Sequence, residues 1–277
     1  MRRALFVSIT VAAAFAALTL ARATPAEASH SWGSYHWART ANPFTLTLVD
    51  SVTSDWNGYL ATARADWTAS TVLDLVTAQG NEDSKERKSC VAISGKVRAC
   101  NQTYGRNGWL GLAHIWVSGN HITQGTTKMN DSYLAADYNT PAWRQFVMCQ
   151  EVGHNFGLGH QDENFYNPNL GSCMDTTADP DGTINGQLSN LHPNGHDYDQ
   201  LVTIYAAHLD STNSFTATAP TGSAGAAADE GGNGPSEWGR AVRSDQHGQP
   251  ILYLRDLGGG RLVFTWVLPA GSTRGRP

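Results

Sequence analysis

Residues 149–162 read CQEVGHNFGLGHQD, and this stretch decides how the rest of the chain is interpreted. If position 150 carried histidine instead of Gln150, the stretch would match H-E-x-x-H-x-x-G-x-x-H. In that pattern two metal-binding histidines stand one helical turn apart, a glutamate lies between them, and a third histidine follows a glycine bend. The sequence therefore predicts a helix that ends in a metal site.

The spacing has a physical basis. Positions i and i+4 share one helix face, so the side chains of Gln150 and His154 can converge on one ion, while Glu151 lies about 100° round the helix. Gly157 can end the helix with a positive φ and turn the chain back, which returns His160 as a third ligand. Three protein ligands leave a fourth position for water, as in catalytic rather than structural zinc sites.

A second motif, GSCMD at residues 171–175, follows a short loop after His160. With both motifs the chain resembles the metzincin zinc metalloproteases, and among them the matrixin-like secreted peptidases, because no tyrosine stands two residues after Met174. The resemblance covers residues 43–210. It implies an α+β fold, in which a twisted mixed β-sheet with an edge strand for substrate packs on three main helices.

The resemblance also implies the site residues. The zinc ligands would be Gln150, His154 and His160, and Glu151 would be the general base of metal-assisted peptide hydrolysis. Met174 would lie beneath the metal as an apolar floor. The implied partner is a protein or peptide substrate.

Gln150 departs from the family pattern, and two interpretations follow. In the favoured one its amide oxygen binds zinc, and the protein is a secreted zinc-dependent metalloendopeptidase that holds its metal less tightly than a three-histidine relative. In the alternative the site is catalytically impaired, and the scaffold is a peptide- or protein-binding module. An ordinary amphipathic helix with stray histidines is disfavoured, because the turn at Met174 would then be a coincidence.

Residues 109–117, which read WLGLAHIWV, are predicted to form a strand. Leu112 and Ala113 resemble the edge strand of the matrixin cleft, and the resemblance implies that their backbone pairs with an extended substrate. His114 is interpreted as structural.

The four cysteines are expected to form disulfides, since residues 1–28 resemble a secretory signal and predict export. We expect Cys90 to pair with Cys100 across a short hairpin. Cys149 and Cys173 would then join the metal helix to the methionine turn, which the family fold places side by side. Zinc ligation by Cys149 is the weaker alternative, because it points elsewhere on the helix than residue 150.

Four segments are predicted. Residues 1–28 resemble a signal peptide, residues 29–210 form the metzincin-like domain, residues 211–236 are a flexible linker, and residues 237–277 contain a β-hairpin. We therefore expect a secreted, extracellular monomer with no membrane attachment after signal cleavage. The formal net charge of -5 gives no indication of nucleic acid or an anionic membrane as a partner.

Hydrophobic periodicity predicts the other elements. These are strands at residues 44–49, 71–76 and 121–130, a hairpin at residues 91–99, helices at residues 54–68 and 196–209, a helix beginning at residues 140–141, and a solvated loop at residues 81–88.

Two further metal predictions are weaker. Asp175, Asp179 and Asp181 suggest calcium, although an ordinary acidic turn explains their spacing better. If Gln150 does not bind the metal, His196 is the best remaining histidine.

Overall fold

The computed structural model describes residues 29–184, 186–206, 208–210 and 231–271. The predicted signal peptide, and residues 211–230 of the predicted linker, lie outside these residues. Within them, nine strands form one sheet. The strands are β1 (His36–Trp37), β2 (Phe44–Ser51), β3 (Leu73–Gln79), β4 (Lys96–Gln102), β5 (Trp109–Ser118), β6 (His121–Asn130), β7 (Arg240–Ser244), β8 (Pro250–Gly258) and β9 (Arg261–Pro269).

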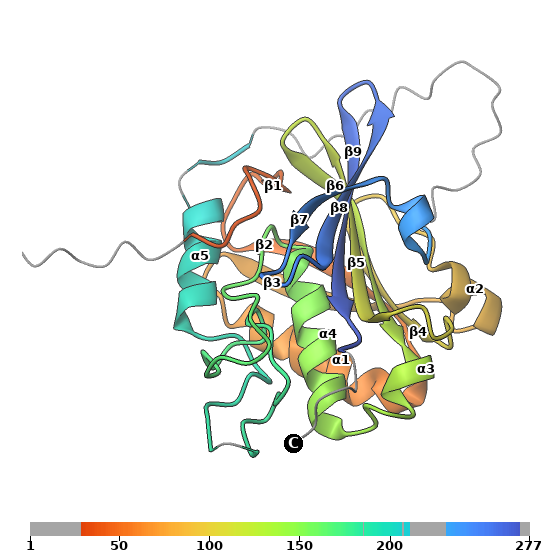
Figure 1. Ribbon diagram of the computed structural model, residues 1–277. Coiled ribbons are helices and arrows are strands. Elements are labelled where there is room, and N and C mark those ends of the chain that lie inside the picture. The colour runs from red at the N-terminus through yellow and green to blue at the C-terminus, as the bar shows by residue number, and fades with distance from the viewer. Residues whose placement is uncertain (1–28, 185, 207, 211–230, 272–277) are drawn as a thin grey trace, which may run out of the picture.

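The sheet is mixed, as predicted. Its order is β3-β2-β4-β6-β5-β9-β8-β7, and β1 pairs with β6 beside this path. Strands β2, β3, β4 and β6 run parallel to one another, whereas β5, β7, β8 and β9 form antiparallel pairs. The protein is therefore an α+β fold whose N-terminal half supplies the parallel strands and whose C-terminal end extends the sheet (Figure 1).

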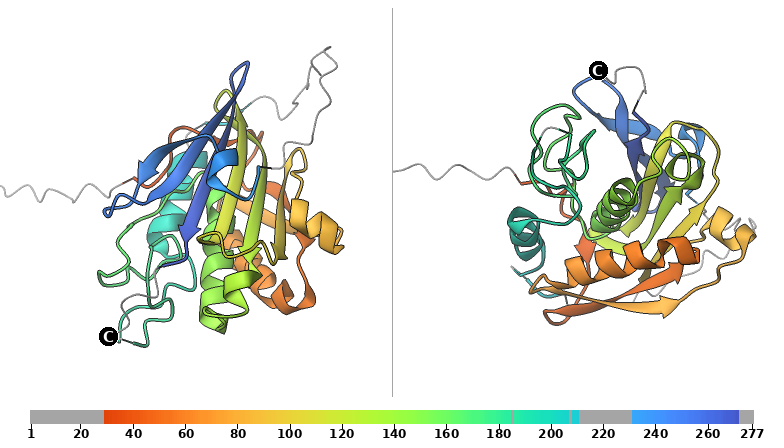
Figure 2. Two further views of the ribbon diagram at one scale, coloured as in Figure 1. Left: turned by 45° about the vertical axis from the view of Figure 1, so that its right-hand side comes forward. Right: turned by 90° about the horizontal axis from the view of Figure 1, so that it is seen from below.

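In the part of the chain that the structure describes, three helices are long, as predicted: α1 (Ser54–Thr68), α4 (Pro141–His154) and α5 (Gly195–Tyr205). The short helices are α2 (Ser84–Ser89), α3 (Asp131–Leu134) and the 3-10 turn η1 (Pro235–Glu237). Helices α1 and α4 lie side by side against the sheet, and α5 stands beside them (Figure 2).

Helix α1 fixes the position of α4. Its buried residues recur every three or four positions, at Trp56, Leu60, Ala63 and Trp67, which places them on one face. The Trp67 indole nitrogen donates to the carbonyl of Cys149 at 3.1 Å. This contact ties the predicted core stripe of α1 directly to the metal helix.

Two local predictions are wrong. Residues 84–89 of the predicted loop form α2. The hairpin predicted at residues 91–99 is absent, because β4 lies between β2 and β6 and runs parallel to both. A parallel neighbour that is distant in sequence gives no short-range turn signal.

The predicted last helix ends earlier than expected. It stops at Tyr205 rather than at residue 209. The buried Arg39 guanidinium donates to the backbone carbonyls of Tyr205 and His208. These charged donors satisfy carbonyls that the next helical turn would otherwise have bound.

The C-terminal hairpin is present as β8 and β9, and it packs back on the main sheet. Strand β9 pairs with β5 along its length. Since β5 also pairs with β6, the expectation of a free substrate edge at Leu112 and Ala113 is wrong for this structure. At the C-terminal end of the sheet the edge strand is β7, and at the other end it is β3. Among the residues that the structure describes, no helix is long and apolar enough to cross a membrane.

Candidate metal centre

Helix α4 carries the predicted motif at its C-terminal end. Thr140 caps the helix by accepting a hydrogen bond from the Trp143 N–H at 3.1 Å, and Pro141 fills the first turn, as predicted. All residues from 145 to 154 are buried. Gly157 has φ +93, the left-handed conformation that the bend after the helix requires.

His154 and His160 meet at the end of this helix, as predicted. Their Nε2 atoms lie 3.1 Å apart, and both side chains are buried. Two imidazoles on one tetrahedral zinc, with bonds of about 2.0–2.1 Å, would hold their nitrogens about 3.3 Å apart. His154 Nδ1 donates to the Leu158 carbonyl at 2.8 Å. Since a carbonyl can only accept, this bond leaves His154 Nε2 unprotonated in the neutral ring, with its lone pair directed at His160.

Gln150 is oriented in the same way. Its Nε2 donates to the Cys173 carbonyl at 3.0 Å, while its buried Oε1 has no hydrogen-bond partner. A buried amide oxygen without a partner is costly. Binding a cation would remove that cost, so Gln150 has the donor atom and the anchoring that an oxygen ligand needs.

Glu151 is buried, and neither carboxylate oxygen has a hydrogen-bond partner. Burial raises the pKa of this carboxyl well above its ordinary value. Gly111 of β5 lies against it, because a Cβ there would be 2.5 Å from Glu151 Oε1. The missing side chain at position 111 therefore makes room for the carboxylate between α4 and the sheet.

The two imidazoles share this apolar environment. Burial lowers the pKa of His154 to about 3. Burial, followed by the neighbouring His154, lowers the pKa of His160 well below its ordinary value. Neutral imidazole is the form that binds metals, so the donor atoms present fit a zinc ion.

The turn that contains Met174 lies against α4. A Cβ at Gly153 would be 2.6 Å from the Met174 sulfur, so the thioether contacts the helix backbone between the motif residues. The disulfide Cys149–Cys173 links the helix to the turn, and Cys90–Cys100 is also formed. Both predicted pairings are therefore present in the structure.

Among the described residues, His196 forms no compact group of three possible metal ligands with His154 and His160. Its ring stacks on His30, with centroids 4.7 Å apart. His30 Nε2 lies 3.1 Å from Asp197 Oδ1.

The acidic residues proposed for calcium bind local groups. Asp175 Oδ2 accepts from the Leu170 N–H at 2.8 Å, and Asp179 Oδ2 accepts from the Ile184 N–H at 3.0 Å. Asp181 Oδ1 accepts from the Thr183 hydroxyl at 2.7 Å. Calcium binding stays a prediction.

The C-terminal segment covers the metal centre, which sequence reasoning missed. Trp266 of β9 pairs with Ala113 in the ladder, and its indole is fully buried. The ring stacks on His154 with centroids 4.5 Å apart and an interplanar angle of 2°, and it meets His160 at 4.9 Å. The alternation of residues 262–267 predicted the strand, but no local signal identified its partner.

A salt bridge holds β7 over the same place. Arg243 Nε lies 2.7 Å from Glu163 Oε1, on the loop after His160. The Arg243 guanidinium also lies 5.9 Å from the centre of the Trp266 ring. The Arg243 guanidinium and the Trp266 indole therefore pack together over the two imidazoles of the candidate metal centre.

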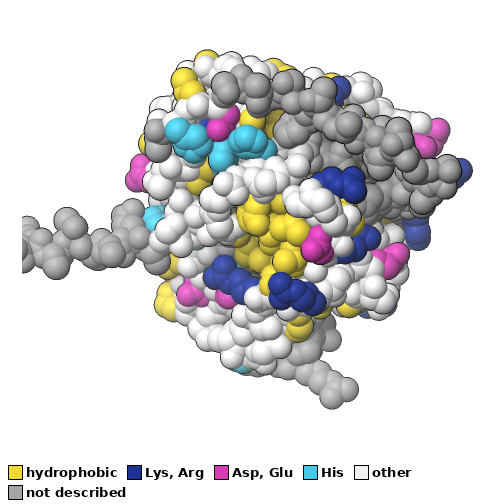
Figure 3. Space-filling model, turned by 90° about the horizontal axis from the view of Figure 1, so that it is seen from above, with side chains coloured by type: hydrophobic (Ala, Val, Ile, Leu, Met, Phe, Trp, Pro, Cys, Tyr) yellow, Lys and Arg dark blue, Asp and Glu magenta, His cyan; other side chains and the backbone are white. Residues whose placement is uncertain are grey.

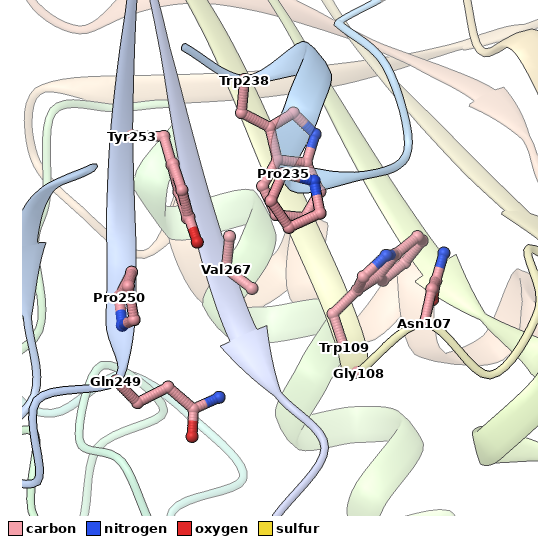
Figure 4. Close-up of a pocket in the computed structure, with 9 residues that line it drawn as sticks. All are labelled: Asn107, Gly108, Trp109, Pro235, Trp238, Gln249, Pro250, Tyr253 and Val267. Carbon is pink, nitrogen blue, oxygen red and sulfur yellow. The ribbon is translucent and has the colours of Figure 1, made fainter. Parts of the chain in front are cut away.

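A separate pocket lies on the other face of the C-terminal hairpin (Figure 4). Trp109, Trp238, Tyr253 and Val267 line it, with none of the motif residues. Val267 neighbours Trp266 along β9, and successive strand side chains point to opposite faces. The pocket is therefore on the opposite side of the sheet from α4.

No protein-family model and no curated protein matches the sequence. Sixteen chains of solved structures are similar to this chain, and two of them serve as examples. High choriolytic enzyme 1, a hatching enzyme zinc-protease from Oryzias latipes (medaka fish), has 12% identity and a TM-score of 0.35 over 64% of this chain and 98% of its own. Myroilysin has 12% identity and a TM-score of 0.37 over 65% of this chain and 99% of its own. Neither likeness is close enough to assign an activity.

Proposed function

We propose that the chain is a secreted, matrixin-like zinc metalloendopeptidase. The observation that carries the proposal is the group of bare donor atoms at the end of α4. The Nε2 atoms of His154 and His160 lie 3.1 Å apart, and the buried oxygens of Gln150 and Glu151 have no hydrogen-bond partners. A structural core would pair such atoms, whereas a metal and a reacting water would use them all.

Each motif residue has a separate role in the proposed reaction. Gln150, His154 and His160 would hold the zinc, and Met174 would support them from below. A zinc ion there would supply Lewis acidity for water activation and for polarising the scissile carbonyl. Glu151 accepts the proton of the attacking water and returns it to the leaving amine. Both buried Glu151 oxygens are without a hydrogen-bond partner, so either can accept that proton.

Substrate binding belongs to the same proposal. An extended peptide would pair with Leu112 and Ala113, which requires β9 to leave β5. Peptide binding without cleavage, by an impaired scaffold, uses the same backbone groups and is the alternative outcome of the test.

The test is casein hydrolysis by the purified chain with added zinc, beside Glu151→Ala, Gln150→His and the surface control Glu82→Ala. The panel is repeated in an Arg243→Ala background, which removes the ion pair to Glu163. We expect Glu151→Ala to lower kcat/KM by about 100- to 10,000-fold while the zinc content is unchanged.

The control Glu82→Ala should hydrolyse casein as the native chain does. Activity only in the Gln150→His variants would identify the native chain as an impaired scaffold. No hydrolysis in any variant, with or without Arg243, would contradict the proposed activity.

A further inference from the structure

A second histidine cluster lies outside the metal centre. His36 comes from β1, His121 begins β6, and His208 and Asp210 follow α5. Figure 3 shows histidine side chains gathered beside an acidic side chain on the upper face of the molecule. The proposed peptidase mechanism uses none of these four residues.

The donor atoms of this cluster converge. His36, His121 and Asp210 each offer one ligand atom, and these three atoms lie within 4.8 Å of one another. Asp210 oxygens lie 3.2 Å from His36 Nε2, 3.4 Å from His121 Nε2 and 3.6 Å from His208 Nε2. The Nε2 atoms of His36 and His208 are 3.3 Å apart, which matches the separation of about 3.3 Å expected on one tetrahedral zinc.

The central imidazole is oriented by the backbone. His36 Nδ1 donates to the Ser34 carbonyl at 2.7 Å, so its Nε2 is unprotonated in the neutral ring. The rings of His121 and His208 both stand nearly perpendicular to His36, at 87° and 90°. The three imidazoles therefore approach the Asp210 carboxylate in different ring orientations.

One cation is already present beside the cluster. Arg39 Nη1 lies 2.8 Å from Asp210 Oδ2. The other carboxylate oxygen, Oδ1, is the one that faces His121 and His208. Arg39 therefore orients the carboxylate, and Oδ1 is directed towards His121 and His208, while Oδ2 also lies 3.2 Å from His36 Nε2.

We propose that His36, His121, His208 and Asp210 form a second zinc site with a structural role. Three imidazoles and one carboxylate complete a tetrahedral zinc shell, and a full shell holds no position open for catalysis. The ion would join three parts of the chain: the N-terminal segment, the turn between β5 and β6, and the segment after α5. It would stabilise the fold by binding only when these parts come together.

The test uses the full chain with His154→Ala and His160→Ala, which removes the catalytic ligands. Zinc content is measured after dialysis, and zinc affinity is measured by competition with a chromophoric chelator. We expect one bound zinc, a visible spectrum of tetrahedral type with cobalt, and a rise in Tm on adding zinc.

The more exposed ligands supply the decisive variants. His121→Ala and His208→Ala, added singly to that background, should each weaken zinc binding at least about 100-fold. His192→Ala is the matched control, because the exposed His192 side chain pairs with Asp66 rather than with Asp210. Absence of bound zinc in the background chain, or equal affinity in the His208→Ala and His192→Ala chains, would overturn the proposal.

A different observation concerns the C-terminal hairpin. Strand β9 occupies the backbone of β5 at Leu112 and Ala113, and Trp266 covers the two imidazoles. Arg243 and Glu163 fasten β7 on the same side. We infer that residues 240–269 are an intramolecular inhibitor that closes the metal centre until β9 leaves β5. This inference rests on the proposed peptidase function.

A reversible disulfide tests the closure. His114 and Thr265 are directly paired across β5 and β9, next to Trp266. Opposed antiparallel residues have Cα atoms about 4.5–5.5 Å apart, which a disulfide can bridge. His114→Cys with Thr265→Cys therefore staples β9 to β5 when oxidised and releases it when reduced.

Two measurements separate the closure from the activity. The oxidised chain should hydrolyse casein at least about tenfold more slowly than the reduced chain, with the native chain in the same reductant as the control. In the metal-free chain, carbethoxylation of His154 and His160 by diethyl pyrocarbonate should slow at least about tenfold on oxidation, while the exposed His192 reacts equally.

The outcomes are distinct. Equal labelling of His154 and His160 in the two redox states would overturn the inhibitory role. Slower labelling in the oxidised chain, without hydrolysis in either state, would support the closure and contradict the peptidase function.

Discussion

The metal centre at the end of α4 and the cluster around Asp210 hold their imidazoles at similar spacings, 3.1 Å and 3.3 Å between Nε2 atoms. They differ in how deeply the rings are buried and in the other donor atoms beside them. The first is buried beneath Trp266, and the third donor proposed for it is the Gln150 amide oxygen. The second is partly exposed and contains a carboxylate and a third imidazole.

This difference separates two kinds of metal chemistry. In the proposed metal centre, a neutral amide oxygen would add no charge and would bind zinc weakly, which would leave the ion more electrophilic. In the proposed second site, a carboxylate and three imidazoles would complete the coordination of the ion and would hold it for stability. The same pair of imidazoles can therefore serve reaction or structure, according to the remaining donors.

Replacing the unusual ligand should produce the largest change. Gln150→His supplies a third imidazole at the first site, and we expect its zinc to resist extraction by a chelator at least about 100-fold better than in the native chain. The rate of zinc loss in the presence of 1,10-phenanthroline checks this, in the His208→Ala background so that only one site is read. Equal rates would show that Gln150 is not the weak ligand.

A small change beside the general base should have the next largest effect. Gly111→Ala places a Cβ 2.5 Å from Glu151 Oε1 and 2.7 Å from Val147 Cγ1. A displacement of Glu151 by about 1 Å should lower kcat about 100-fold, with little change in zinc content. The control is Gly58→Ala, since a Cβ at that helical position meets nothing within 4 Å. Full activity in Gly111→Ala would show that Glu151 does not act from this position.

The two disulfides provide a matched pair. Replacing Cys149 and Cys173 with alanine opens a link between residues 24 apart, and replacing Cys90 and Cys100 opens one between residues 10 apart. Each should cost about 3 kcal/mol of unfolding free energy, measured in urea. Only the first should also speed zinc loss from the α4 site, because Cys173 accepts the Gln150 hydrogen bond. Equal zinc loss in both variants would contradict this positioning role.

The smallest effect concerns pH. Burial raises the pKa of Asp175 to about 6. A carboxyl with a higher pKa in the folded chain binds more protons when folded, so stability falls as pH rises from about 4 to about 6. Asp175→Asn should remove this decrease in the free energy of unfolding, which amounts to about 2 kcal/mol between the two pH values. Urea unfolding across the pH range measures it, with the exposed Asp55→Asn as control, and an unchanged slope would contradict the assignment.

Local patterns predicted the metal helix well. Thr140, Pro141, the i and i+4 spacing of Gln150 and His154, and the bend at Gly157 are all short-range signals, and the structure reproduces each of them. The pairing of His154 with His160 followed from that spacing.

Long-range pairing accounts for what the sequence could not predict. The alternation in residues 262–267 predicted strand β9, but nothing local indicates that a strand pairs with β5, about 150 residues earlier. The second cluster joins His36 to His208 and Asp210 across more than 170 residues. No spacing rule connects such residues, because only the folded sheet brings them together.

The most direct test of the account is zinc K-edge X-ray absorption on the His208→Ala chain loaded with one zinc. The account predicts two imidazole ligands and additional oxygen at that zinc, and three imidazoles in the same chain with Gln150→His. Three imidazoles in both chains would contradict it, because another histidine would then occupy the place assigned to the Gln150 oxygen.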